Sequence, residues 1–84
     1  MKLYKLTQEV NNDYDTYNSC VVAAKNEDEA RLIHPDEWPD VKKVDNWAMF
    51  SVWAYKPDQV AVEYLGTAKP GTKKGVILAS FNAG

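Results

Sequence analysis

Cysteine and long apolar runs are the features that this sequence of 84 residues most clearly lacks. The single cysteine, Cys20, excludes an intramolecular disulfide and a cysteine-based zinc cluster, and it suits a reducing cytosol. The longest unbroken apolar run, 20–24, is far shorter than the roughly 20 residues that cross a bilayer. The sequence opens without the basic-then-apolar pattern of a signal peptide. We therefore expect a cytoplasmic protein that does not contact a membrane.

A basic excess and recognisable catalytic motifs are also missing. Ten Lys and Arg against twelve Asp and Glu give a net charge of −2, which argues against general nucleic-acid binding. The one histidine, His34, has no Cys, Asp or Glu at metal-ligand spacing, and by default it hydrogen-bonds a carbonyl at a helix end. Without a catalytic Ser/His/Asp order, a paired-carboxylate frame or a zinc motif, we expect no enzyme activity, cofactor or metal.

What is present describes an ordinary folded domain. Hydrophobic residues make up 45% and charged residues 26% of the chain. A chain this short buries only about 60–65% of its extended surface, so it has room for one core. We expect a single domain over 1–84 that forms a homo-oligomer.

Local patterns predict four strands and one short helix. Asn26 and Glu29 form a capping box that starts a helix, and Pro35 ends it at His34. The first strand contains lysines typical of a sheet edge, whereas apolar runs predict that the second and the last strands are buried. The predicted strands cover 2–8, 19–24, 59–65 and 76–81.

The middle of the chain is rich in aromatic residues and harder to assign. Residues 44–55 alternate imperfectly, which favours a strand, but the spacing of Val41, Val44, Ala48 and Val52 also permits a helix. Whether 41–55 is strand or helix stays open. The predicted fold is a small α+β domain with a β-β-α-β-β core, a mainly antiparallel sheet and one helix on one face.

A polar loop between the first two predicted strands carries two tyrosines. Tyr14 and Tyr17 can stack on a planar ligand while Asp15 accepts its hydrogen bonds; the alternative is a surface turn with half-packed tyrosines. The acids of the loop alternate as in a calcium-binding loop. However, Thr16 stands where that loop has glycine and Val22 where it has glutamate, which argues against calcium.

The segment 69–75 holds three of the ten basic residues. Its two glycines lie four apart and a strand follows them, so it is not the phosphate-binding loop of nucleotide hydrolases. Thr72, Lys73 and Lys74 nevertheless suggest a local anion site. The alternative is a solvated loop between two strands.

Three tryptophans in 84 residues is a high density. Large aromatic side chains fill the core of a small domain, and they are also favoured at interfaces. We expect at least one tryptophan to be partly exposed. The expected interface residues are Trp38, Trp47 and Phe50.

Several segments together resemble small uncharacterised proteins encoded by phages and prophages. The resemblance rests on Tyr14-Asp15-x-Tyr17, Val21-Val22-Ala23-Ala24, Glu29-Ala30-Arg31, His34-Pro35 and the ending Gly75 to Gly84. It implies a small accessory protein that works in the cytoplasm of a bacterial host, and it assigns no role to any single residue.

Two functions are open for such a protein. One is an anti-defence sponge that sequesters a nucleotide second messenger, such as a cyclic oligonucleotide or an ADP-ribose derivative, without cleaving it. Aromatic rings would stack on its bases and cations would bind its phosphates. The expected ligand-binding residues are Tyr14, Asp15, Tyr17, Arg31, His34, Trp53, Thr72, Lys73 and Lys74.

The other function is a protein–protein interaction module that inhibits or recruits a host or phage protein. It needs only an exposed aromatic surface with a polar rim, which the tryptophan-rich segment 36–58 offers. The loops rich in tyrosine and lysine favour the sponge, whereas the net negative charge of the chain favours the interaction module.

Overall fold

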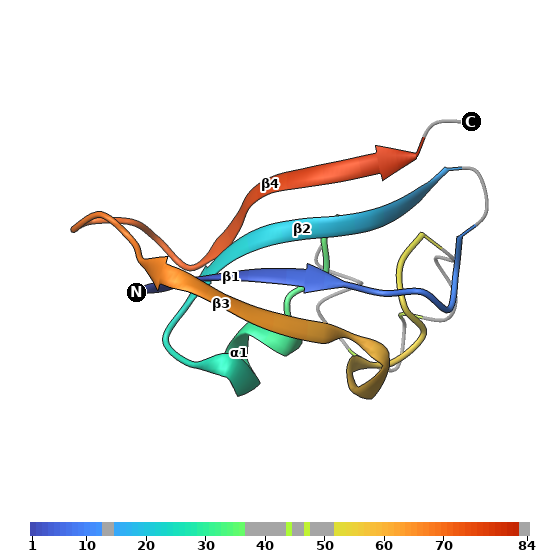
Figure 1. Ribbon diagram of the computed structural model, residues 1–84, viewed down its shortest axis with the longest axis horizontal. Coiled ribbons are helices and arrows are strands. Elements are labelled where there is room, and N and C mark those ends of the chain that lie inside the picture. The colour runs from blue at the N-terminus through green and yellow to red at the C-terminus, as the bar shows by residue number, and fades with distance from the viewer. Residues whose placement is uncertain (13–14, 37–43, 45–46, 48–51, 83–84) are drawn as a thin grey trace.

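Figure 1 shows the computed structural model of the chain, which describes residues 1–12, 15–36, 44, 47 and 52–82. Four strands carry most of the described backbone. The elements are β1 (Lys2–Thr7), β2 (Thr16–Ala24), α1 (Glu27–Arg31), the 3₁₀ turn η3 (Pro57–Gln59), β3 (Ala61–Thr67) and β4 (Gly75–Asn82).

The four strands form one antiparallel sheet in the spatial order β3-β1-β2-β4. β1 therefore lies inside the sheet between β2 and β3, and β4 is the outermost strand beyond β2 (Figure 1). The helix α1 contacts β1, β2 and β3, so it packs on one face of the sheet. This is a small α+β fold with a four-stranded antiparallel sheet and one short helix, as the sequence predicts.

The helix begins as expected and ends earlier. Asn26 accepts a hydrogen bond from the Glu29 N–H at 2.8 Å. The Glu29 carboxylate accepts a hydrogen bond from the Lys25 N–H at 3.0 Å. The capping box predicts the Asn26 N–H as this donor, so the observed donor lies one residue earlier. The N–H groups of Leu32 and Ile33 bond to carbonyls three residues earlier, a tightening typical of a helix end. α1 therefore stops at Arg31 and not at His34.

The core lies on the face that α1 covers. Since strand side chains alternate between faces, the strand register groups the core residues into two rows across the sheet. One row is Val62, Leu6, Cys20 and Ala79, and the other is Tyr4, Val22 and Val76. Tyr64 continues the second row on β3, where it packs against the Tyr4 ring but is 57% exposed. The cluster of buried residues is completed by Ala24, Ala30, Ile33, Trp47, Trp53, Ala54 and Val60. Cys20 is a buried free thiol, as predicted.

Two strands lie elsewhere in the sheet than the sequence predicts. The lysines of the first strand suggest an edge, but β1 is paired on both sides, with β2 and with β3. Lys5 is exposed because its side chain alternates with those of the buried Tyr4 and Leu6 and so projects from the face of the sheet opposite α1. The apolar last strand suggests a buried position, but β4 is an edge. Its side chains Ile77, Leu78 and Phe81 are 53%, 69% and 47% exposed.

The aromatic middle is described only in part. Residues 52–55 form bends and not a strand. Apart from Val44 and Trp47, the rest of 41–51 lies outside the described residues, so the choice between strand and helix stays open there.

Candidate functional site

The second tyrosine of the predicted loop, Tyr17, lies in β2 and is half-buried. The Tyr17 hydroxyl donates a hydrogen bond to Asp36 Oδ1 at 2.8 Å, and the ring packs edge-on against Phe81 with 4.8 Å between centroids. Burial, and then the Asp36 carboxylate, raises the pKa of Tyr17 to about 12. Asp15 is exposed at a positive φ of 61°. Tyr14 lies outside the described residues.

Arg31 is held by structural contacts. Its guanidinium pairs with Glu27 at 3.0 Å on the same helix and donates a hydrogen bond to the Val60 carbonyl. These contacts fasten α1 to the chain that enters β3. A phosphate that binds Arg31, as the sequence predicts, would have to compete with Glu27 and the Val60 carbonyl for the guanidinium.

His34 lies in the core and not at a ligand-facing surface. It is 3% exposed, and its Nδ1 accepts a hydrogen bond from the Asp36 N–H at 3.1 Å. Its ring packs edge-on against Trp47, with 5.4 Å between centroids. Burial lowers the pKa of His34 to about 4, although the Asp36 charge opposes this shift. The imidazole is therefore neutral at pH 7.

The two described tryptophans of the predicted site are fully buried. Trp53 has no exposed surface, so it offers no ring face for stacking, and the prediction that it stacks on a ligand does not fit its position. Trp47 is equally buried, because both tryptophans belong to the core cluster, and it cannot form the predicted interface. Trp38 and Phe50 lie outside the described residues.

The lysines of the loop before β4 are exposed and lie far from Tyr17. Thr72 Oγ1 donates to the Lys69 carbonyl at 2.7 Å, Lys74 Nζ lies 3.9 Å from Glu29, and Lys73 is exposed. The loop leads into β4 opposite Ala23 of β2, whereas Tyr17 is six residues away at the other end of β2. Six residues of strand span about 20 Å. The structure therefore does not bring Tyr17 together with Thr72, Lys73 and Lys74.

A different surface emerges on the face of the sheet opposite α1, which we call the open face. The register places Glu63 of β3, Lys5 of β1, Val21 of β2 and Leu78 of β4 side by side in one row across all four strands. We call these four residues the docking row. Lys5, Glu63 and Leu78 are exposed and Val21 is half-buried.

The neighbouring rows of the open face differ in chemistry. Toward the start of β1, Leu3 lies between Ala23, which is fully buried, and Gly66, so this end of the face is apolar and largely covered. In the other direction the next row is Ala61, Thr7, Ser19 and Ser80, which carries three hydroxyls. The open face thus changes from apolar to hydroxyl-bearing along the strands, with the docking row between.

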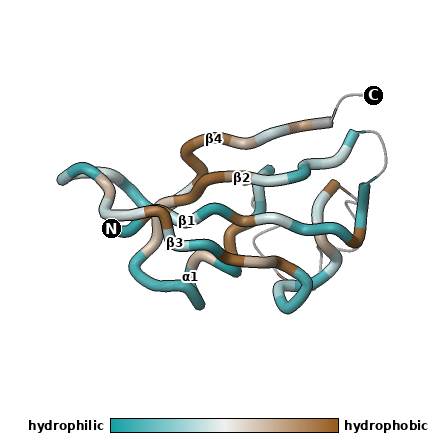
Figure 2. The backbone as a smooth tube through the Cα atoms, in the orientation of Figure 1, coloured by the Kyte–Doolittle hydropathy of each residue, from teal (hydrophilic) through white to brown (hydrophobic). Residues whose placement is uncertain are grey.

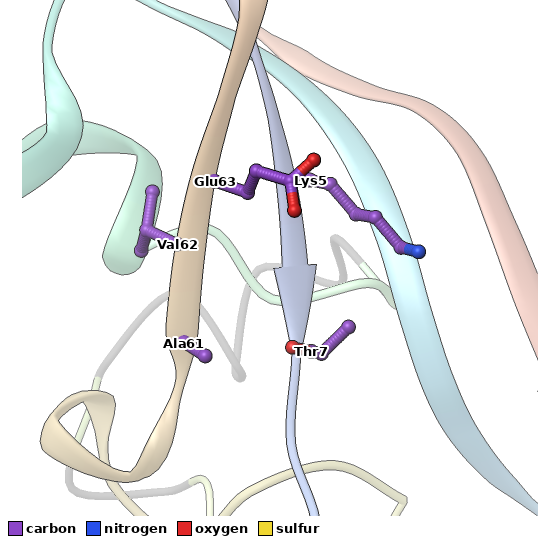
Figure 3. Close-up of a pocket in the computed structure, with 5 residues that line it drawn as sticks. All are labelled: Lys5, Thr7, Ala61, Val62 and Glu63. Atoms are coloured by element: carbon purple, nitrogen blue, oxygen red, sulfur yellow. The ribbon is translucent and has the colours of Figure 1, made fainter.

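Two depressions flank Lys5 on this face. One, of about 350 Å³, lies between β1 and β3 and is lined by Lys5, Thr7, Ala61, Val62 and Glu63. Figure 3 shows the Glu63 carboxylate above β1 and the Lys5 side chain extending over β2. The other, of about 210 Å³, lies on the far side of Lys5 and is lined mostly by β2 and β4. Lys5 therefore stands between two shallow hollows, each bordered by apolar side chains.

Sequence reasoning missed the open face. The alternation of Lys5 with Tyr4 and Leu6 indicated a strand with one polar side, but the composition of one strand does not reveal its neighbours. Within the described ranges no three His, Cys, Asp or Glu side chains are grouped to hold a metal ion. No helix in the same part of the chain is long and apolar enough to span a membrane.

Comparisons with known proteins found no match to this chain among protein-family models, curated proteins or solved structures. The function must therefore be inferred from the geometry and chemistry of the open face.

Proposed function

We propose that this protein is a stoichiometric binding module that docks a partner protein on the open face of its sheet. The docking row carries the proposal, because it aligns two apolar side chains and two opposite charges across four strands. At its outer end Leu78 is 69% exposed, the highest value among the large hydrophobic residues that the structure describes.

The apolar half of the row supplies the affinity. Full burial of a leucine side chain is worth about 1.5–3 kcal/mol, and most of the Leu78 side chain is still in water. Val21 lies beside it and is partly covered. A partner that places an apolar group over Leu78 and Val21 gains this free energy.

The charged half supplies selectivity. Lys5 and Glu63 are register partners, and the structure gives neither of them an ion pair within the described part of the chain. A partner with a carboxylate above Lys5 and a cation above Glu63 matches the row, whereas reversed charges meet repulsion. The hydroxyl row beside it provides a polar rim. The partner is thus a protein surface with an apolar patch next to a pair of opposite charges.

The resemblance to phage-encoded accessory proteins suggests a host or phage protein as this partner, which the module inhibits or recruits. The surface differs from the tryptophan-rich one that the sequence favoured. The nucleotide sponge stays a prediction that none of these findings tests. Among its described residues, the exposed Lys73 beside Thr72 favours it most, whereas Tyr17, Arg31 and Trp53 are engaged within the fold.

The test uses variants of the docking row. Affinity capture with the wild-type chain from a bacterial lysate identifies the partner, and calorimetry with the purified partner measures the binding. We expect Leu78→Lys and Lys5→Glu each to weaken binding at least about tenfold, which corresponds to 1.4 kcal/mol. Lys73→Ala, an exposed change outside the open face, is the matched control and leaves the affinity unchanged.

Equal binding by wild type and both docking-row variants would overturn the proposal. So would a thermal-shift screen in which a cyclic nucleotide or an ADP-ribose derivative stabilises the protein, is recovered intact, and loses its effect in the Lys73→Ala, Lys74→Ala double variant. That outcome would establish the sponge.

A further inference from the structure

The Lys5 side chain points away from the acid that faces it across the strands. Lys5 and Glu63 are register partners on β1 and β3, a placement in which opposite charges usually attract each other. The structure nevertheless gives Lys5 no ion pair with any residue that it describes. In Figure 3 the Glu63 carboxylate lies above β1, whereas the Lys5 side chain extends over β2. The ammonium group is therefore directed toward the smaller depression, which β2 and β4 line.

This smaller depression, which we call the Lys5 hollow, has a different chemistry at each end. Two cross-strand pairs of the open face line it beside Lys5, Val21 with Leu78 and Ser19 with Ser80. The first pair is apolar and the second carries two hydroxyls. Because side chains on one face of a strand recur every second residue, the two pairs lie about 7 Å apart. Figure 2 shows hydrophobic colour where the first half of β4 lies beside β2, which is the apolar end of the hollow.

Two register shifts bound the hollow. One follows Tyr17 and the other follows Val21, and between them 19–21 pairs regularly with 78–80. Such irregularities re-aim side chains, and they are common next to active sites. Leu78, directly beside one of them, is 69% exposed. The hollow is therefore a short regular frame that presents an apolar side chain to solvent.

The hollow fits an anion that is joined to a small apolar group. The Lys5 ammonium and the hydroxyls of Ser19 and Ser80 can all donate hydrogen bonds to a carboxylate. The volume of about 210 Å³ is below the about 300–1,000 Å³ of pockets for drug-sized ligands, so the hollow holds one residue and not a large ligand. The negative charge of Glu63 on the other side of Lys5 favours a singly charged carboxylate over a doubly charged phosphate.

We propose that the Lys5 hollow binds the carboxyl-terminal residue of the partner protein, with the α-carboxylate against Lys5 and an aliphatic side chain over Val21 and Leu78. This inference rests on the proposed function and names the part of the partner that docks. The carboxylate and the side chain of a terminal residue branch from one carbon atom, so a single residue reaches both ends of the hollow. Chain termini usually lie at the surface of a domain, which suits a depression as shallow as this one. Capture of a terminal carboxylate is a recurring mode of peptide recognition.

An NMR titration of the purified chain with a short peptide tests the site directly. The probe is N-acetyl-Ala-Ala-Leu with a free carboxylate, and its matched control is the same peptide with a carboxyl-terminal amide. We expect the acid to bind with a millimolar Kd, since the contact is small, and to shift the backbone amide signals of 19–21 and 78–80. The amide binds at least about tenfold more weakly, because it lacks the charge that Lys5 recognises.

Variants assign the two ends of the hollow. Lys5→Met keeps an unbranched side chain and removes the charge, so we expect it to bind the acid as weakly as the amide. Lys5→Arg keeps the charge and retains the preference for the acid. Leu78→Ser weakens the binding of both peptides about threefold or more, because apolar contact is lost. Lys73→Met, an exposed change outside the open face, is the matched control and leaves both affinities unchanged. The amide spectrum of each variant verifies its fold.

Four outcomes of the titration would overturn the inference. One is equal binding of the acid and the amide by the wild type, and another is the absence of any shift at millimolar peptide. The third is a preference for the acid that survives in Lys5→Met. The last is equal binding of an amidated peptide whose only carboxylate belongs to an internal glutamate, since an internal acid would then serve as well as a chain end.

The partner that affinity capture identifies separates this inference from the proposed function. We expect removal of the last residue of that partner to weaken docking at least about tenfold, as Lys5→Glu does. A truncated partner that binds as tightly as the full one, while the docking-row variants still weaken binding, overturns terminal capture and supports the proposed function. Equal binding by the wild type and both docking-row variants overturns the proposed function itself.

Discussion

The phenol of Tyr17 donates a hydrogen bond of 2.8 Å to the carboxylate of Asp36, and this contact joins β2 to the chain that follows α1. The Tyr17 backbone N–H donates to the Val52 carbonyl at 2.7 Å, and its ring packs edge-on against Phe81 of β4. One residue thus fastens three segments that are far apart in the sequence. It is a structural anchor at the end of the sheet distant from the lysine loop.

Removing the Tyr17 hydroxyl tests this anchor. We expect Tyr17→Phe to lower the free energy of unfolding by about 1 kcal/mol, the usual net value of a hydrogen bond, while the ring packing stays. The pKa of Tyr17 is about 12 in the folded state and near 10 when unfolded. This stabilisation is therefore complete below pH 10 and is lost as the pH rises through 12. Urea unfolding at pH 8 and pH 11 measures both effects, and equal alkaline losses in wild type and Tyr17→Phe would contradict the assignment.

Burial of His34 predicts a loss of stability in acid. Its pKa is about 4 in the folded state against 6.5 unfolded, so the unfolded chain takes up a proton first as the pH falls. The loss begins near pH 6.5 and is complete below pH 4. Urea unfolding between pH 7 and pH 4 measures it. In His34→Gln, which cannot charge, this part of the acid dependence disappears, and an unchanged pH profile in that variant would refute the prediction.

Gln8 organises the loop between β1 and β2. Its side chain is 4% exposed, donates to the carbonyls of Asn11 and Tyr17, and accepts from the N–H groups of Val10 and Asn11. We expect Gln8→Ala to lower the free energy of unfolding by about 2–3 kcal/mol, because it leaves buried backbone groups without partners. The exposed Asn12 bonds only locally to the Glu9 carbonyl, so Asn12→Ala costs less than about 0.5 kcal/mol in the same denaturation experiment.

Arg31 gives a prediction that separates its two contacts. Arg31→Met removes both the bond to the Val60 carbonyl and the pair with Glu27, and it costs about 1–2 kcal/mol of stability. Glu27→Gln removes only the partly exposed ion pair, so its effect stays below about 0.5 kcal/mol. Equal losses in the two variants, measured by denaturant unfolding, would show that the carbonyl contact contributes nothing.

Local patterns predicted the elements because their causes are local. The Asn26 cap and the acidic first turn position α1, and each of the four observed strands overlaps its predicted range within a few residues. Helix length was less predictable, since the tight turn at Leu32 and Ile33 ends α1 before Pro35 does.

The candidate site could not be predicted from the sequence in this way. Tyr17 and Lys73 both look available for a ligand in the sequence, but the length of β2 separates Tyr17, near the start of that strand, from the loop that carries Lys73. Trp53 looks equally available for stacking, yet it is fully buried in the only core that a chain of this size has room for. Which aromatic residues face inward depends on contacts between distant segments.

The sequence by itself determined a small α+β domain with alternating strands, a capped helix and a buried cysteine, because these follow from periodicity and capping chemistry along a short stretch of chain. Only the tertiary structure decided which strands are edges. Strand order depends on non-local hydrogen bonds: it placed the lysine-bearing β1 inside the sheet and the uncharged β4 at its rim. The register then aligned Glu63, Lys5, Val21 and Leu78 in one row, because pairing joins residues that no local pattern connects.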